Sequence, residues 1–223
     1  MEEERGTEME DTKIVLSRVL PGEIEARSFE IITEELGDRH FLEEEDPIIK
    51  RVIHTTADFD YADNLVFSPG AVEAALSALR AGTDIVTDTN MGKAGINKKA
   101  LGALGGQVLC FMADEDVAQA AKERGMTRAA ASMDKASQLG RDVIFAVGNA
   151  PTALVRLYEL IQNGKLRPRL IIGVPVGFVN VEASKELILS LQDTPYIVAR
   201  GRKGGSNVAA AICNGLLYQI GRG

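Results

Sequence analysis

The sequence predicts an α/β fold, with a three-layer α/β/α architecture, a mainly parallel sheet and additional N-terminal helices. From Asp84 onward, short apolar runs alternate with helical segments. This alternation is typical of parallel strands with helices on both faces. Three of the runs are almost continuously apolar, as strands covered on both sides are. No linker or repeat follows residue 12, so we expect a disordered acidic tail over 1–12 and a single domain over 13–223.

Three helices are predicted before the first strand. The first begins at Pro21, and the second has Asp46 as its N-cap and Pro47 as its first helical residue. The third begins at Ser68-Pro69 and ends at Gly82. Spacings of three and four residues define one face of each helix: Ile24, Ser28, Ile31, Ile32 and Glu35 or Leu36 on the first helix, and Val72, Ala75, Leu76 and Leu79 on the third.

The remaining elements are strands and the helices that follow them. Strands are predicted at 84–87, 107–112, 142–147, 170–176 and 196–199, and later helices at 128–139 and 208–220. In sheets of this kind, ligands bind where the carboxyl ends of the strands run into loops. Those loops are 88–92, 113–116, 148–151, 177–180 and 201–206. We therefore expect a ligand site at that edge of the sheet.

Composition and charge narrow the function. The hydrophobic content of 45% is that of an ordinary globular protein, and the net charge of -7 argues against binding to nucleic acid or anionic membranes. Cys110 and Cys213 lie in apolar segments and are expected to be small buried side chains in a reducing compartment. The first residues lack signal-peptide features, and no apolar stretch approaches the ~20 residues that span a bilayer. We expect a cytoplasmic protein.

No metal site is expected from the sequence. Two histidines and two scattered cysteines do not form a zinc site. Asp58, Asp60 and Asp63 lack the glycine turn and the terminal glutamate of a calcium loop. These three aspartates are expected to form a solvated acidic loop.

His54 is the candidate for proton transfer. An imidazole is the one side chain whose ordinary pKa lies near neutrality. On the helix that starts at Pro47, Lys50, Arg51 and His54 fall opposite the apolar stripe of Ile49, Val52, Ile53 and Thr56. This position fits two interpretations: an exposed surface histidine, or a histidine whose face of the helix meets a pocket or a partner subunit.

Two further places could bind an anion. The loop 201–207 combines glycines with Arg202, Lys203 and Ser206 and leads into a helix, whose N-terminus attracts negative charge. The loop matches no dinucleotide or triphosphate motif, and it could equally be a glycine turn with solvated charges. Arg128 follows the expected N-cap Thr127, where a cation opposes the helix dipole. Either a carboxylate docks on Arg128 or the arginine is simply solvated.

Several ordered motifs resemble one protein family. They are Ile24-Glu-Ala-Arg-Ser-Phe29, Arg51-Val-Ile-His-Thr-Thr56, Phe67-Ser-Pro69, Gly148-Asn-Ala-Pro-Thr-Ala-Leu154, Gly173-Val-Pro-Val-Gly-Phe-Val179 and Ala199-Arg-Gly-Arg-Lys-Gly-Gly-Ser206. From about residue 20 to residue 215 the chain is similar to the precorrin-8X methylmutases, also called cobalt-precorrin-8 methylmutases, of cobalamin biosynthesis. The resemblance implies an isomerase that moves a methyl group from C-11 to C-12 of a corrinoid by a 1,5-sigmatropic shift. It also implies a homodimer with pockets at the subunit interface and no soluble cofactor.

The resemblance assigns roles to individual residues. His54 corresponds to the family's catalytic histidine, and Ser28, Arg51 and Arg128 to residues that contact substrate. The substrate carries several carboxylates, which would meet these arginines and the loop with Lys203 and Ser206. His54 would then protonate the macrocycle and take the proton back.

The segment after His54 carries two details of the resemblance. Ala57 stands where glycine is expected in many members of the family, and the continuation from Thr55 to Tyr61 is more similar to the branch that acts on cobalt-containing substrate.

Two other functions fit parts of the sequence. A carrier that binds the tetrapyrrole without catalysis would need the same polyanion pocket. A nucleotide-binding α/β enzyme would rest on the glycine-rich turns alone.

Overall fold

The computed structural model describes residue 20 and residues 23–221, and the elements below are those of these residues. They are α1 (Ile24–Leu36), α2 (Asp46–Thr56), α3 (Tyr61–Asn64), β1 (Leu65–Phe67), α4 (Ala71–Arg80), β2 (Asp84–Thr87), α5 (Asn90–Gly95), α6 (Lys98–Ala103), β3 (Val108–Leu109), α7 (Glu115–Arg124), α8 (Arg128–Ser137), β4 (Val143–Val147), α9 (Pro151–Gln162), β5 (Leu170–Gly173), α10 (Val181–Leu189), β6 (Tyr196–Ala199) and α11 (Ser206–Ile220). The expected tail over 1–12 and the helix start at Pro21 lie outside the described residues.

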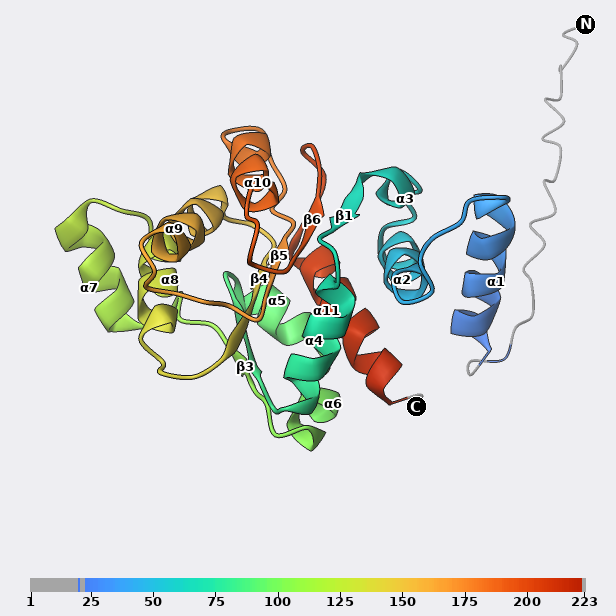
Figure 1. The fold of residues 1–223 in the computed structure, drawn as a ribbon, viewed down its shortest axis with the longest axis horizontal. Helices are drawn as coiled ribbons and strands as arrows, with labels where there is room; N and C mark the ends of the chain where they lie inside the picture. Colours follow the sequence, from blue (N-terminus) through green and yellow to red (C-terminus); the bar gives the residue numbers. More distant parts are fainter. Residues whose placement is uncertain (1–19, 21–22, 222–223) are drawn as a thin grey trace, which may run out of the picture.

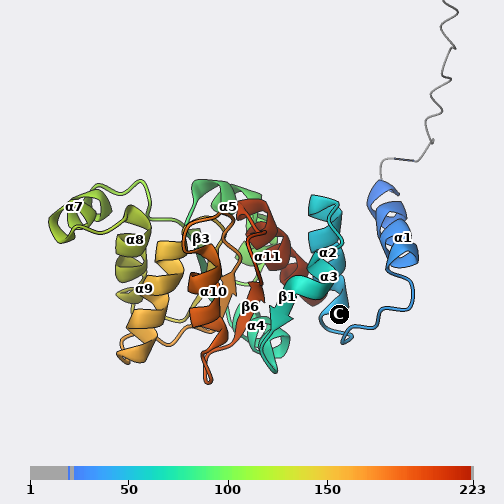
Figure 2. The same ribbon diagram turned by 90° about the horizontal axis from the view of Figure 1, so that it is seen from above.

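One six-stranded sheet forms the middle layer, in the order β1-β6-β5-β4-β2-β3. All neighbouring strands are parallel except β1, which runs antiparallel to β6. Along β4, Ile144 and Ala146 face a core shared with α2, α4 and α11, whereas Phe145 faces a core shared with α8, α9 and α10. Figures 1 and 2 show these two groups of helices on opposite sides of the sheet. The predicted three-layer architecture is confirmed.

The reversed strand β1 determines where the N-terminal helices reach the sheet. Leu65, at the amino end of β1, is paired with Ala199 at the carboxyl end of β6. The N–H group of Arg200 continues this pairing by donating to the carbonyl of Asn64 at 2.8 Å. Since α2 and α3 immediately precede β1, they lie next to the carboxyl edge of the sheet. The loops that follow the parallel strands begin at this edge.

The starts of two N-terminal helices differ from the prediction. Asp46 does not cap α2: it is the first helical residue after Glu45, and its carboxylate binds Lys50 at 2.8 Å. Helix α4 begins after Gly70 rather than at Ser68, because the Ser68 hydroxyl accepts a hydrogen bond from the Tyr196 N–H group at 2.9 Å. In both cases a tertiary or side-chain partner replaces the expected cap.

Helix α1 is covered on only one side. It packs mainly against α2 and lies at the end of the molecule (Figure 2). Ile32 and Leu36 are buried, but Ile24 is 54% exposed and Ile31 is 39% exposed, so the predicted apolar stripe is only partly covered within one chain.

The other predicted boundaries shift by a few residues. The run 107–112 contains only the short strand β3, and the run 170–176 is a strand only as far as Gly173. Helix α8 ends at Ser137, and α11 begins at Ser206, two residues earlier than expected. Cys213 is buried, which raises the pKa of its thiol to about 12, but Cys110 is only partly buried. Among the described residues, no helix has the length and apolar content needed to cross a bilayer.

Candidate active site

His54 and Ser28 line the same cavity, although they come from different helices. The cavity has a volume of about 260 Å³ and lies between α1 and α2, with a mainly apolar lining that includes Ile31, Ile53 and Phe59. His54 is on the last turn of α2, and its side chain is exposed. The Ser28 hydroxyl donates to the carbonyl of Ile24 at 2.9 Å, which leaves its lone pairs available as acceptors. The structure therefore brings together two of the predicted site residues.

Aromatic stacking orients the His54 ring. The ring stacks on Phe29 of α1, with centroids 5.5 Å apart and an angle of 26° between the planes. The Arg51 guanidinium carbon lies 5.3 Å from the same Phe29 ring and 4.6 Å from the ring of Tyr218. Arg51 also donates to the Glu25 carboxylate at 2.5 Å, and only 13% of its side chain is exposed. In one chain, Arg51 therefore supports the His54 neighbourhood from within the protein rather than facing the cavity.

The turn after His54 has an unusual backbone. Ala57, which caps the C-terminus of α2, has φ 52° and ψ 31°, a left-handed conformation that costs a non-glycine residue about 1 kcal/mol. Ala57 also lines the cavity with His54. Alanine thus occupies a position that glycine, the residue expected here from the family resemblance, would adopt more easily.

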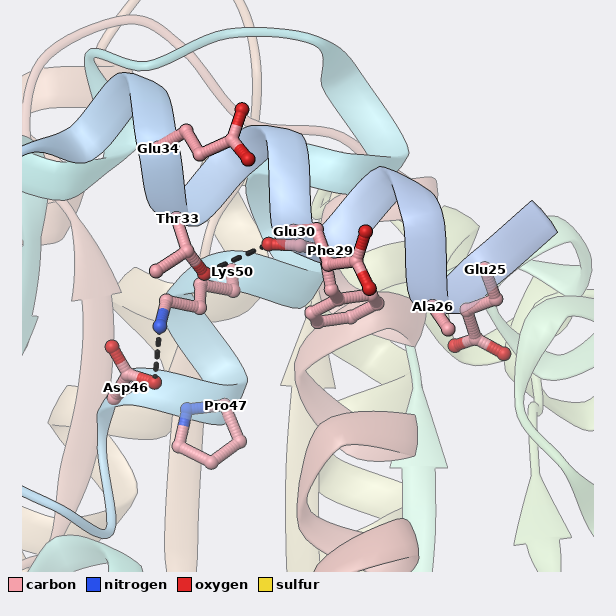
Figure 3. A pocket seen from close by; sticks show the side chains of 9 residues that line it. All are labelled: Glu25, Ala26, Phe29, Glu30, Thr33, Glu34, Asp46, Pro47 and Lys50. Carbon is pink, nitrogen blue, oxygen red and sulfur yellow. Dashed lines mark hydrogen bonds and ion pairs between the residues drawn. The ribbon is translucent and has the colours of Figure 1, made fainter. Parts of the chain in front are cut away.

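A larger groove lies on the other side of α1 but has the wrong charge for an anionic ligand. It has a volume of about 810 Å³ and is open between α1 and α2 (Figure 3). Its lining contains four carboxylates, from Glu25, Glu30, Glu34 and Asp46, and a single cation, Lys50, which Asp46 already binds. Of the other carboxylates, Glu25 pairs with Arg51 and Glu30 with Arg27, so the lining offers a ligand carboxylate no unpaired cation.

Lys203 meets protein carboxylates next to His54. Its ammonium nitrogen lies 2.6 Å from both Asp58 and Asp60, in the segment that follows α2. The hydrogen bond from Lys203 lowers the pKa of Asp58, and the two carboxylates raise the pKa of Lys203. Asp60 remains 65% exposed, as expected of a solvated acidic loop, but both aspartates also share a lysine partner that was not expected. Asp63 binds elsewhere, to Arg39 at 2.8 Å.

The rest of the 201–206 loop is also engaged by protein groups. Arg202 lies 3.4 Å from Glu182 and over the ring of Phe178. The Ser206 hydroxyl is 2.7 Å from the Thr89 hydroxyl. The cations of this loop thus have carboxylate partners in the isolated chain, so a substrate carboxylate would have to compete with them or bind beside them.

Asp88 fills the crevice at the centre of the carboxyl edge. The strand order reverses between β2 and β4, and ligands of open α/β sheets bind at such a reversal. Here the buried Asp88 carboxylate accepts hydrogen bonds from the N–H groups of Gly148, Asn149 and Ala150 at 2.7–2.9 Å. Burial raises the pKa of Asp88, and these hydrogen bonds oppose that rise. The N–H groups that could hold a phosphate are therefore occupied by a carboxylate of the protein.

Arg128 lies far from His54 within one chain. Thr127 caps α8 as predicted, by accepting a hydrogen bond from the Ala130 N–H group at 3.2 Å. The exposed Arg128 side chain lines an open cavity formed by residues of α7 and α8. These two helices lie at the opposite end of the molecule from α2 (Figures 1 and 2). The structure thus separates Arg128 from His54 and Ser28, which line a cavity between α1 and α2.

Three residues of the site region were not identified from the sequence: Phe29, Asp88 and Lys185. Lys185 had a readable signal, because it lies four residues after Val181 and three before Ile188, on the buried face of α10. Asp88 directly follows a fully buried strand, where a charge needs a partner. Among the described residues no group of three or more histidine, cysteine or acidic side chains could hold a metal ion.

Comparisons with known proteins identify one family. The profile of the family described as precorrin-8X methylmutase matches residues 23–219. The cobalt-precorrin-8 methylmutase of Salmonella typhimurium is 47% identical over 90% of this chain and 96% of its own length. That of Priestia megaterium is 45% identical over 89% of this chain and 88% of its own.

A solved structure shows the same similarity in three dimensions. The structure described as precorrin-8X methyl mutase from Thermus thermophilus superposes with a TM-score of 0.82 at 40% identity, and covers 90% of this chain and 98% of its own. The family profile, the sequence relatives and this structure all span most of the chain. This chain therefore belongs to the precorrin-8X methylmutase family.

Proposed function

We propose that this protein is an isomerase that moves a methyl group from C-11 to C-12 of a precorrin-8-type corrinoid. His54 donates a proton to the macrocycle, which makes the ring electron-poor and speeds the 1,5-sigmatropic shift, and then takes the proton back. The observation that carries this proposal is the cavity that His54 shares with Ser28. Both relatives described above are named for cobalt-precorrin-8, so the cobalt-containing substrate is the first to test.

The cavity and the Phe29 ring that stacks on His54 each have a role in this reaction. Stacking on Phe29 fixes the plane of the imidazole, so that the proton is delivered in one direction. Ser28 is placed to accept a hydrogen bond from the substrate. The apolar side chains of Ile31, Ile53 and Phe59 exclude water from the ring face that is protonated.

The working form is proposed to be a cytoplasmic homodimer. The His54 cavity, at about 260 Å³, is smaller than the roughly 300–1,000 Å³ of ordinary ligand sites. Arg128 of the same chain lies too far away to help complete it (Figure 1). A second copy that presents its α8 to α1 and α2 would cover Ile24 and Ile31 and would bring Arg128 to the substrate carboxylates.

Substitution of His54 tests the chemistry. His54→Ala is expected to bind the coloured substrate but to slow its conversion roughly 10²–10⁴-fold, the usual contribution of a general acid. Conversion is followed by the absorption spectrum, and mass spectrometry checks that the mass stays unchanged. His40→Ala, which alters the other exposed histidine, is the matched control. Near wild-type conversion by His54→Ala would show that the assigned role is wrong, and binding without any conversion by the wild type would identify a carrier.

Mixed dimers test the shared site. His54→Ala and Arg128→Ala chains are each expected to be inactive or weak alone. When the two are co-expressed, random pairing should restore roughly a quarter of the wild-type activity, because each mixed dimer regains one intact site. Arg80 is an exposed arginine on α4, and Arg80→Ala is the control for Arg128→Ala. The Arg80→Ala chain should be fully active alone. Absence of any recovery would contradict a site built from two copies.

A further inference from the structure

Lys185 is a lysine with no exposed surface. It lies on α10, and 0% of the residue is accessible to solvent. Its ammonium group donates to the carbonyl of Gly201 at 2.7 Å and to the carbonyl of Lys203 at 2.8 Å. Both acceptors are backbone groups of the loop between β6 and α11.

Burying an ammonium group in this way is costly. Burial lowers the pKa of Lys185 to about 8, against the opposing influence of Glu182. An apolar side chain of similar length would avoid this cost but could not donate to the two carbonyls. What lysine provides at this position, and an apolar residue would not, is therefore the pair of hydrogen bonds to the loop backbone.

The side chains of the loop that Lys185 holds have partners, but its backbone makes few other hydrogen bonds. Gly201 has φ 74°, and Gly205 donates to the carbonyl of Val174 at 2.9 Å. Gly177 donates to the carbonyl of Arg202 at 3.2 Å. Without Lys185, the carbonyls of residues 201 and 203 would lose their side-chain donor, and the backbone at residue 203 would no longer be fixed.

The loop in turn holds the segment after His54. The side chain of Lys203 binds Asp58 and Asp60, both at 2.6 Å. These aspartates follow the left-handed Ala57 that ends α2, whose last turn carries His54. A continuous series of contacts thus runs from the buried ammonium of α10 to the end of the helix with His54.

We propose that Lys185 is a positioning residue of the methylmutase site: by fixing the backbone of Lys203, it directs the Lys203 side chain to the segment that sets the place of His54. This inference rests on the proposed function. It concerns a residue that touches no substrate and acts through Lys203, Asp58 and Asp60.

A double-mutant cycle tests the proposal. Lys185→Met and Lys203→Met are each expected to lower kcat/KM about ten-fold or more. The double variant should lose little beyond the larger single effect, because both substitutions break the same series of contacts. Lys165→Met, an exposed lysine after α9, is the control and should leave kcat/KM unchanged. Additive losses, or full activity of Lys203→Met, would overturn the proposal. Since Lys203 lies on the surface, its variant remains informative if Lys185→Met fails to fold.

A measurement without substrate separates this proposal from the proposed function. Amide hydrogen exchange followed by mass spectrometry should show about ten-fold faster exchange in residues 57–61 and 201–205 of Lys185→Met. In Lys203→Met only residues 57–61 should exchange faster. Unchanged protection of 57–61 in both variants would overturn the positioning role even for an active enzyme. If the wild type converts no corrinoid but shows these exchange changes, the proposed function fails and the mechanical link stands.

Discussion

The loops at the carboxyl edge of the sheet and the surface around His54 are built in opposite ways. At the carboxyl edge, the buried charges of Asp88 and Lys185 bind backbone N–H and carbonyl groups. Around His54, the side chain that would do the chemistry is exposed and is oriented by stacking on Phe29. The first region fixes the main chain, whereas the second presents side chains on an already stable helix. Substitutions should therefore affect mainly folding in the first region and mainly activity in the second. Lys185 is the exception, because it also acts on the segment after His54 through Lys203.

The largest effect on stability is expected at Gly204. A Cβ atom at this position would lie 2.1 Å from the carbonyl oxygen of Val174, a backbone atom that cannot move away. Gly204→Ala should therefore lower the free energy of unfolding by more than about 3 kcal/mol, measured by urea denaturation. His54→Ala, from the other region, should change it by less than about 0.5 kcal/mol. Equal losses in the two variants would remove the contrast between the regions.

A smaller loss of stability is expected at Asp88. Asp88→Asn keeps the shape of the side chain but replaces one acceptor oxygen with an NH₂ group that faces backbone N–H groups. The loss of these charge-assisted hydrogen bonds should destabilise the protein by about 2 kcal/mol, measured as a shift in thermal unfolding. Asp63→Asn, which alters an exposed ion pair with Arg39, should have little effect. Wild-type stability of Asp88→Asn would show that the carboxylate does not fix the 148–150 loop.

The smallest effect is a pH dependence that arises from Lys185. The pKa of this buried lysine is about 8, whereas that of an unfolded lysine is about 10.4. Between these pH values the unfolded chain binds more protons, so stability rises as the pH rises. Glu182 is the charged group that opposes the fall in the pKa of Lys185, and Glu182 itself pairs with Arg202.

The measurement compares the wild type with Lys185→Met. Between pH 8 and pH 9 the wild type should gain about 1 kcal/mol of unfolding free energy relative to the variant. Urea denaturation at several pH values gives both curves under the same conditions, so that titration of other groups cancels. Parallel curves would mean that Lys185 does not titrate in this range and that its ammonium is better solvated than its position indicates.

The contrast also explains which features could be read from the sequence. The parallel strands were predicted because fully buried strands are continuously apolar, as the segment from Val143 to Val147 is. The position of His54 outside the apolar stripe of α2 was predicted from helical spacing. Helix caps were less predictable, because Asp46 has Lys50 as a nearby partner and Ser68 has a partner that is distant in sequence.

Pairings between distant segments were not predictable from local patterns. Lys203 was expected to await an anionic ligand, but its partners Asp58 and Asp60 are about 145 residues away in sequence. They meet because β1 pairs with β6, which no periodicity within either segment reveals. The distance of Arg128 from His54 has the same origin, since it depends on the order of all the strands.

The direction of β1 has a consequence for how the fold could change during evolution. A three-residue strand spans only about 10 Å, yet its orientation decides whether the preceding helix emerges at one rim of the sheet or at the other. If β1 were parallel to β6, the imidazole would be delivered to the rim opposite the glycine-rich turns. Insertions in the connections of this small edge strand are tolerable only if they keep it antiparallel to β6. The residues of the strand should therefore vary far more freely than its direction.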